Sequence, residues 1–339
     1  MHLFGKDLDH EVALVAEIGV NHEGDVEKAS ELVRLASESG ADAVKFQSFT
    51  PARYASASDR ARLARVTGFA LDEAAHRRLA AEAAELGVVF FSTAVSEDLV
   101  PLLAELCPVI KIASGDLDFE PVIRAAAATG KPLIISTGLG TLDEVDQAVD
   151  WVRDEVGAAA LPERLVLLQC VTAYPTPVAE ANVLAVPLLA ERYGVPVGFS
   201  NHVLGPEACY AAIAHGACLI EAHFTDAKAG REFRDHELSF EPQEFAALAA
   251  AAPRIRAALG SGAKERQPSE SGILAAVRKG VVAARDLPAG HALERDDLMY
   301  ARPATEFAAH ELPTLVGRRL VAAVATGELI ARDNVGVKT

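Results

Sequence analysis

The chain has 339 residues, half of them hydrophobic, and carries 32 basic and 48 acidic side chains, which give a formal net charge of −16. A chain of this length buries a large core and has room for one large domain and a small one. The negative charge argues against nucleic acid or an anionic membrane surface as a partner. A small anionic substrate stays compatible with it, because a few local lysines can outweigh the global field.

The four cysteines show neither a CxxC pair nor metal-ligand spacing, and each lies in apolar sequence: Cys107, Cys170, Cys209 and Cys218. This pattern is typical of core thiols in a reducing compartment. The first ten residues, MHLFGKDLDH, lack the regions of a signal peptide, and no segment approaches the length of a membrane span. We therefore expect a cytoplasmic protein with no membrane partner.

Eight short apolar runs alternate along the chain with alanine- and leucine-rich stretches of helical length. The runs span residues 12–18, 43–49, 88–92, 109–113, 133–136, 165–170, 195–199 and 219–223. Continuous apolar runs are typical of parallel strands buried on both faces. Eight strand and helix units over about 260 residues predict an α/β fold of the TIM (β/α)8 barrel type. A doubly wound open sheet is the rival, although no GxGxxG follows the first run.

Three other regions differ from this alternation. Residues 49–70, after the second run, are predicted to form a loop. The segment 261–272 is polar and rich in Gly and Ser, which is typical of a linker. Residues 273–339 hold short strand-like runs separated by turn sequences such as DLPAGHAL, so we expect a small β-rich domain after a barrel domain at 1–260.

Two histidines close neighbouring strands, since His202 follows the seventh run and His223 ends the eighth. Glu17, near the end of the first run, lies beside the eighth once the barrel closes. Two imidazoles at the same height suit a divalent metal. The alternative is a pair of hydrogen-bonded histidines at a polar rim.

Two lysines lie inside apolar runs, and a buried lysine needs an anion. Lys45 and Lys111 either pair with structural carboxylates or bind an anionic substrate. Serines close neighbouring runs and add hydroxyl donors, which favours a phosphorylated or carboxylated small molecule. Carboxylates suited to sugar hydroxyls, or to capping helices, lie in the same regions. The serines are Ser114, Ser136 and Ser200, and the carboxylates are Glu17, Asp116 and Asp235.

A series of motifs resembles the sialic acid synthase family, the N-acetylneuraminate synthases and their relatives. They are AEIGVNHEGD (16–25), KFQ (45–47), KIASGD (111–116), STG (136–138), YPTP (174–177), GFSNH (198–202), EAHFTD (221–226) and RDHELSFEP (234–242). The stretch RKGVVAARDLPAGHALERDDLMYARP (278–303) resembles the antifreeze-like, or SAF, domain of that family. The resemblance covers nearly the whole chain in the same order.

The resemblance implies a transferase that condenses phosphoenolpyruvate with an amino sugar to give a nine-carbon 2-keto-3-deoxy acid. It implies a divalent metal, with Mn²⁺ expected before Mg²⁺ or Co²⁺, held by His202 and His223. These two histidines, Glu17 and Lys111 match catalytic positions. Positions matching phosphoenolpyruvate ligands are Lys45, Lys111, Ser114, Ser136 and Ser200. Positions matching the acceptor side are Glu17, Gln47, Asp116, Asp235 and Tyr174, the last of them near both substrates.

The resemblance also implies a domain-swapped homodimer, in which Arg302 reaches the partner's barrel and meets the N-acyl group of the sugar. Departures fall on the sugar side: from the proline of the Arg-Pro pair the chain reads PATEFAAHELP, Asp116 stands where many relatives have Glu, and Thr172 replaces a common Asn. One alternative is a synthase acting on another aldose or a sugar phosphate, for which Arg53 and Arg60 are the basic candidates. The other is a non-catalytic binding protein, which the charged turns of the small domain disfavour.

Overall fold

The chain folds into two compact units, Met1–Ser261 and the residues from Gly262 onward, in a computed structural model that describes residues 1–338. The predicted small domain ends at residue 339, which lies outside the described range. None of the helices within residues 1–338 combines the length and apolarity that crossing a lipid bilayer requires.

Eight parallel strands close into a barrel in the first unit, in the order β10-β3-β4-β5-β6-β7-β8-β9. Closure pairs the last strand with the first and places His223 opposite Glu17. The predicted TIM barrel is therefore confirmed and the open sheet is excluded. The strands are β3 (Ala13–Gly19), β4 (Ala43–Ser48), β5 (Val89–Ala94), β6 (Ile110–Ile112), β7 (Leu133–Ser136), β8 (Leu165–Cys170), β9 (Val197–Asn201) and β10 (Leu219–His223).

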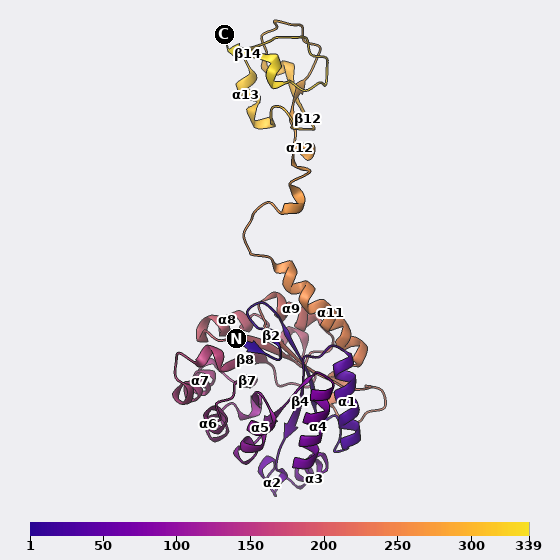
Figure 1. Cartoon of the computed structure of the whole chain (residues 1–339), viewed down its shortest axis with the longest axis vertical. Helices are drawn as coiled ribbons and strands as arrows, with labels where there is room; N and C mark the ends of the chain where they lie inside the picture. Colours follow the sequence, from indigo (N-terminus) through magenta and orange to yellow (C-terminus); the bar gives the residue numbers. More distant parts are fainter. Residues whose placement is uncertain (339) are drawn as a thin grey trace. The chain divides into compact units, whose positions relative to one another are not determined.

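Helices surround the strands on the outside (Figure 1). They are α1 (Val26–Glu38), α4 (Glu73–Glu85), α5 (Val100–Leu106), α6 (Glu120–Ala128), α7 (Leu142–Val156), α8 (Ala185–Tyr193), α9 (Glu207–Ala214) and α11 (Pro242–Leu259). A two-stranded hairpin, β1 (His2–Leu3) and β2 (Lys6–Asp7), precedes the barrel. The short helix α10 (Asp235–Leu238) lies between β10 and α11.

The sequence explains where these helices begin, which face they bury and how they end. Asp25 caps α1 by accepting from the backbone of the first turn, and the buried residues of α1 recur at helical spacing. Five helix-to-strand turns use a glycine with positive φ, a conformation that costs other residues energy. These glycines are Gly40, Gly87, Gly130, Gly194 and Gly216.

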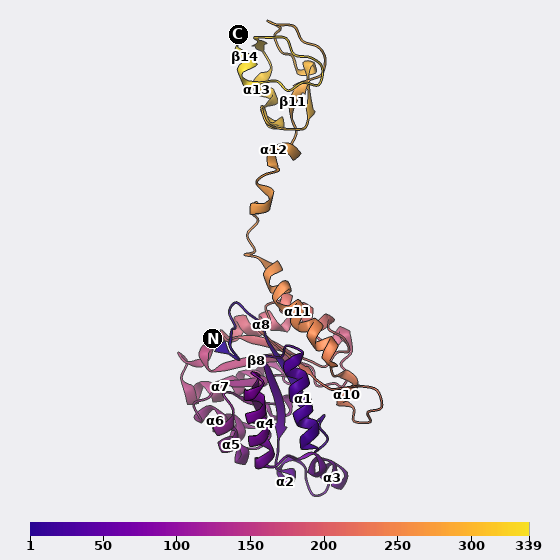
Figure 2. The same ribbon diagram turned by 45° about the vertical axis from the view of Figure 1, so that its right-hand side comes forward.

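The prediction of a loop at 49–70 is wrong, because this stretch contains α2 (Pro51–Tyr54) and α3 (Arg60–Phe69). Asp59 caps α3 by accepting from the amide of Arg62. Val66 is buried in a small cluster of its own with Phe49 and Val20, apart from the main barrel core. Figure 2 shows α2 and α3 together at one end of the barrel unit, with the N-terminus at the other.

The second unit has a small apolar core and two antiparallel strand pairs, β11 (Gly280–Ala283) with β12 (Leu298–Ala301) and β13 (Arg318–Leu320) with β14 (Val335–Lys338). Two short helices accompany them, α12 (Leu274–Val277) and α13 (Leu312–Leu315). The prediction of a small β-rich domain is confirmed.

Candidate active site

A layer of charged side chains lies inside the barrel near the carboxyl ends of its strands. Glu17, Lys45, Lys111 and Glu221 come from β3, β4, β6 and β10, and none is more than 5% exposed. Burying a charge this deeply costs free energy unless the charge is paired. The partners of each side chain therefore decide which charges remain available to a ligand.

Lys45 is neutralised within the chain. Its Nζ lies 2.9 Å from Glu17 Oε1 and 3.6 Å from Glu221 Oε2. Burial lowers the pKa of Lys45, but the two carboxylates outweigh it and raise that pKa above its usual value. Burial would raise the pKa of Glu221, but Lys45 and Lys111 outweigh it and lower that pKa. The structure thus pairs Lys45 with carboxylates, and its predicted contact with phosphoenolpyruvate stays a prediction.

Lys111 has a different environment. Its Nζ donates to Ser136 Oγ at 2.6 Å and to the carbonyl of Ile112 at 2.7 Å. Within residues 1–338, no carboxylate lies within ion-pairing distance of it. Burial therefore lowers the pKa of Lys111 to about 8. A buried ammonium with neutral partners is ready to bind an anion.

Hydroxyl groups and a glycine extend this site toward the loops after β6 and β7. Ser114 Oγ accepts from the amide of Gly138 at 3.1 Å. A Cβ built on Gly138 would lie 2.4 Å from Thr172 Oγ1, a buried hydroxyl with no hydrogen-bond partner in the described chain. Ser200, in contrast, donates to Glu221 at 2.9 Å. Two of the three predicted serines thus lie on the Lys111 side, and Ser200 supports the charged layer.

The two histidines meet at the ends of β9 and β10, with ring centroids 5.3 Å apart. His202 Nδ1 donates to the carbonyl of Val171 at 2.7 Å, so its Nε2 carries the free lone pair. His223 Nδ1 is buried without a partner in the described chain. Burial, and then the neighbouring His202, hold the pKa of His223 well below its usual value.

A metal ion is compatible with this pair. A neutral imidazole anchored through one nitrogen is a usual metal ligand, and the orphan atoms Glu17 Oε2 and His223 Nδ1 are buried polar groups that lack a partner. No group of three or more His, Cys, Asp or Glu side chains with metal-site spacing occurs in the described part of the chain. The two imidazoles therefore fit an ion that takes its other ligands from water or substrate.

A cavity of about 430 Å³ brings together four predicted acceptor residues, Gln47, Asp116, Tyr174 and Asp235. The Tyr174 ring lies 4.2 Å from His202 and 5.9 Å from His223, centroid to centroid. Burial raises the pKa of Asp116 to about 6. The cavity therefore holds two carboxylates beside Tyr174, whose ring contacts both histidines, and α3 forms part of its wall.

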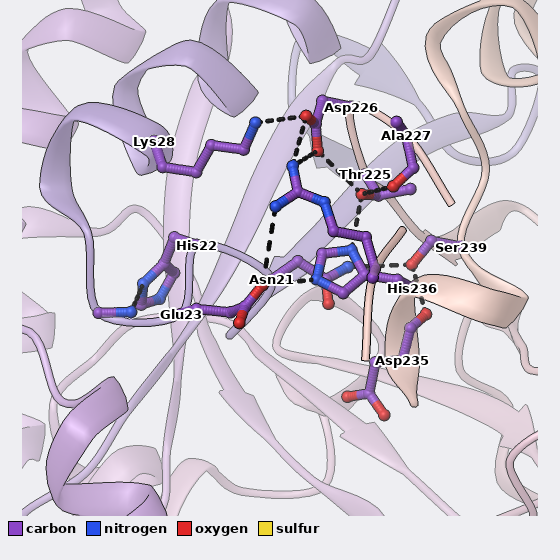
Figure 3. A network of polar contacts seen from close by, with 12 residues as sticks. Asn21, His22, Glu23, Lys28, Thr225, Asp226, Ala227, Asp235, His236 and Ser239 are labelled. Carbon is purple, nitrogen blue, oxygen red and sulfur yellow. Dashed lines mark hydrogen bonds and ion pairs between the residues drawn. The ribbon is translucent and has the colours of Figure 1, made fainter. Parts of the chain in front are cut away.

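A polar network holds the segment that carries Asp235 (Figure 3). Asn21, from the loop after β3, donates to Ser239 Oγ and to the carbonyl of Phe224, each at 2.9 Å. Ser239 donates in turn to the carbonyl of Asp235 at 2.6 Å. The imidazole of His236 contacts Thr225 Oγ1 at 2.7 Å and Glu23 Oε1 at 3.2 Å. These contacts join the first and last loops of the barrel at one point.

Arg302 belongs to the second unit, where its Nε donates to the carbonyl of Val277 at 2.5 Å. Its predicted contact with a partner's acceptor stays a prediction. Arg53, one of the two basic candidates for a sugar phosphate, pairs with Glu97 and Asp98, and neither Arg53 nor Arg60 lines the cavity.

Sequence reasoning missed Glu221, which belongs to the buried charged layer. It also missed three arginines that line the cavity, Arg62, Arg65 and Arg234. Glu221 had a signal, because it lies two residues before His223 in the same strand and so shares its face. Arg234 directly precedes Asp235 in a motif that sequence reasoning used. The two arginines of α3 had no signal once that stretch was taken for a loop.

Comparisons with known proteins point to one family. The sequence matches the NeuB family over residues 32–264 and the SAF domain over residues 278–335. It is similar to N,N′-diacetyllegionaminic acid synthase of Legionella pneumophila, with 36% identity over 95% of this chain and 94% of that protein. It is also similar to N-acetylneuraminate-9-phosphate synthase of Homo sapiens, with 30% identity over 97% of this chain and 95% of that protein.

A solved structure agrees. The crystal structure of N-acetylneuraminic acid synthetase from Leptospira borgpetersenii, in complex with citrate, superposes with a TM-score of 0.73 and 30% identity. The match covers 78% of this chain and 90% of that one. The family resemblance stated from the motifs is confirmed.

Proposed function

The chain belongs to the NeuB family and carries a SAF domain, and we propose that it condenses phosphoenolpyruvate with an N-acylhexosamine to form a nonulosonic acid. The product is a nine-carbon 2-keto-3-deoxy sugar acid of the sialic or legionaminic type. The observation that carries the proposal is the position of Lys111. It is a buried cation without a carboxylate partner, in the same barrel as an imidazole pair and a carboxylate-lined cavity.

The reaction forms one carbon–carbon bond, and at C2 it replaces the carbon–oxygen bond to the phosphate group with a bond to an oxygen from water. C3 of phosphoenolpyruvate attacks the aldehyde carbon of the open-chain sugar, and the aldehyde oxygen becomes a hydroxyl after it takes a proton. Water adds to C2, and phosphate leaves with the bridging oxygen, so that C2 becomes a ketone. Lys111, Ser136 and Ser114 hold the anionic groups of phosphoenolpyruvate by charge-assisted hydrogen bonds.

His202 and His223 would hold the divalent ion, for which Mn²⁺ is our first choice and Mg²⁺ or Co²⁺ the alternatives. An ion bound there supplies Lewis-acid polarisation of a carbonyl group. Glu17 accepts hydrogen bonds from Lys45 and Gln47 through Oε1, which leaves the buried Oε2 to orient water. Burial raises the pKa of Glu17, so this carboxyl is suited to hold a proton during turnover.

The acceptor sugar occupies the cavity, where Asp116, Asp235 and Gln47 bind its hydroxyl groups and Tyr174 covers one side. Arg302 of a second copy meets the N-acyl oxygen in a domain-swapped homodimer.

The direct test is incubation with phosphoenolpyruvate, Mn²⁺ and a panel of N-acylhexosamines. Phosphate release must depend on the acceptor, and the product mass must equal acceptor plus pyruvic acid. Treatment with a chelator should stop the reaction, and added Mn²⁺, Mg²⁺ or Co²⁺ should restore it to different extents. Phosphate release that yields free pyruvate without any acceptor would instead identify a phosphatase and contradict the proposal.

A further inference from the structure

The cavity that receives the acceptor is lined at its outer end by arginines. Arg62 and Arg65 come from α3, and Arg234 comes from the segment just before α10. Two carboxylates, Asp116 and Asp235, line the same cavity. The lining therefore gathers three guanidinium groups with two carboxylates, in a chain whose overall charge is −16.

The spacing on α3 places both of its arginines toward the cavity. Arg62, Arg65, Val66 and Phe69 follow the i, i+3, i+4, i+7 pattern of one helix face, and all four line the cavity. Val66 is buried, whereas Arg62 and Arg65 are exposed. The two charges therefore border the same cavity as the apolar residues of this face.

The three arginines differ in how far the protein satisfies them. The Arg62 guanidinium lies 3.4 Å from the carboxylate of Asp59, which caps its helix. The Arg234 guanidinium lies 3.3 Å from the carboxylate of Asp235 and 4.8 Å from the centre of the Tyr174 ring. The side chain of Arg65 makes no hydrogen bond, ion pair or ring contact within the described residues. Its guanidinium therefore has all its donors available at the cavity wall.

The two segments that carry these arginines touch each other. The Phe69 and Phe233 rings pack edge to face with centroids 5.3 Å apart. Gly24 also approaches α3 so closely that a Cβ there would lie 2.0 Å from the carbonyl of Gly68. The arginines thus project from a packed rim, and not from unsupported loops.

We infer that the acceptor is a phosphorylated N-acylhexosamine, whose phosphate monoester binds Arg65, Arg62 and Arg234 while its aldehyde end lies near the histidine pair. This inference rests on the proposed function and names its substrate class. Phosphate suits this rim because its three oxygens accept from several guanidinium forks at once. The open rim also leaves such a strongly hydrated group partly in water, which lowers the cost of binding it.

Phosphoenolpyruvate could be a second source of anionic groups for these arginines. The groups that suit it, Lys111, Ser114 and Ser136, do not line this cavity. An arginine that binds the acceptor phosphate must change kcat/KM for the acceptor and leave the apparent KM for phosphoenolpyruvate nearly unchanged, so kinetics separate the two sources.

The experiment compares N-acetylmannosamine, its 6-phosphate and an unphosphorylated diacetamido-hexose as acceptors for the full-length protein. We expect kcat/KM for the 6-phosphate to exceed that for either neutral sugar by about 100-fold, from two or more charge-assisted contacts. Arg65→Ala should lower kcat/KM for the 6-phosphate by about tenfold, and any loss with the neutral sugars should be much smaller. Arg65→Lys should recover part of the loss. Arg60→Ala, which removes the same charge from the same helix outside the cavity lining, is the matched control.

Four other results would each contradict either the phosphorylated acceptor or the synthase proposal. Equal or better use of a neutral sugar, with Arg65→Ala showing no acceptor-dependent loss, would overturn the phosphorylated acceptor and leave the synthase proposal standing. A loss confined to phosphoenolpyruvate kinetics would also overturn it, by assigning the arginine to the other substrate. An equal loss in Arg60→Ala would reduce the effect to general electrostatics and overturn it as well. No acceptor-dependent phosphate release with any sugar would contradict the synthase proposal itself.

Discussion

Lys45 and Lys111 lie in one barrel layer and differ in what neutralises them. Lys45 has two carboxylates within 3.6 Å, whereas Lys111 has a serine hydroxyl and a backbone carbonyl. Removing one partner of a buried ion pair costs about 3–5 kcal/mol, which is a large share of the stability of a typical domain. We therefore assign Lys45 mainly to holding Glu17 and Glu221 in place, and Lys111 to substrate.

The pKa of about 8 for Lys111 predicts a pH dependence. In the free protein the ammonium is present below that pH and is lost above it, because burial disfavours the charged form. Above pH 8, kcat/KM for phosphoenolpyruvate should therefore fall about tenfold per pH unit, measured at saturating acceptor. Lys111→Met should lower kcat/KM by about 30-fold or more at pH 7 and remove this limb. A wild-type profile that stays flat to pH 9.5 would rule out this role.

The sequence showed which charged residues lie in apolar strands, but it did not show which residues pair with them. The lysines inside apolar runs were predicted to need anions, yet only the barrel register shows that Lys45 finds Glu17 opposite it on β3. Glu221 looked like part of an apolar strand, and it becomes a partner of Lys45 only when the barrel closes. Pairing across strands depends on curvature and closure, which a linear pattern does not contain.

At the level of elements, the strands were predictable because each is a continuous apolar run with buried residues on both faces. The observed ends equal the predicted ones, as for β8, or differ from them by one or two residues, as for β9, which runs from Val197 to Asn201. The helix α3 was missed because it buries only Val66 and contains Gly68, so its apolar periodicity is weak. Contacts with loops that are distant in the sequence hold α3 in place, and these contacts shape the cavity wall.

The network around α10 predicts a separable effect on the acceptor. Asn21→Ala leaves the carbonyl of Phe224 and the hydroxyl of Ser239 without their donor, at a cost of about 1–3 kcal/mol. Because Asp235 follows in the same chain of contacts, KM for the acceptor should rise about fivefold or more, with little change in KM for phosphoenolpyruvate.

Ser239→Ala should give the same selective rise, because it removes the contact to the Asp235 carbonyl while preserving the fold around it. Arg34→Ala, on an exposed ion pair of α1 with Glu38, is the control for unspecific loss of stability. Equal increases in both KM values, in step with a fall in Tm, would show that the network supports only general stability.

At the level of the whole molecule, the open question is what the second unit contributes to the reaction. It has its own core and an Arg-Pro pair within the match to the SAF domain. We propose that Arg302 serves the active site of a second copy, so activity should depend on pairing between chains.

Mixing two inactive variants tests this pairing. His202→Ala and Arg302→Ala chains are each expected to lose nearly all activity. After subunit exchange, half of the dimers are mixed and each has one intact site, so about a quarter of wild-type activity should return. Exchange confirmed by differently tagged chains, without any return of activity, would show that Arg302 acts within its own chain or has no catalytic role.

The central claim is that phosphoenolpyruvate loses its phosphate by carbon–oxygen cleavage after joining a sugar. The most direct measurement uses phosphoenolpyruvate labelled with ¹⁸O at the bridging oxygen, an N-acylhexosamine acceptor and mass spectrometry of both products. The account predicts that the label leaves with inorganic phosphate, that release depends on the acceptor, and that the sugar acid gains its ketone oxygen from water. Label retained in the keto acid, or found in pyruvate without acceptor, would mean cleavage at phosphorus and would contradict the account.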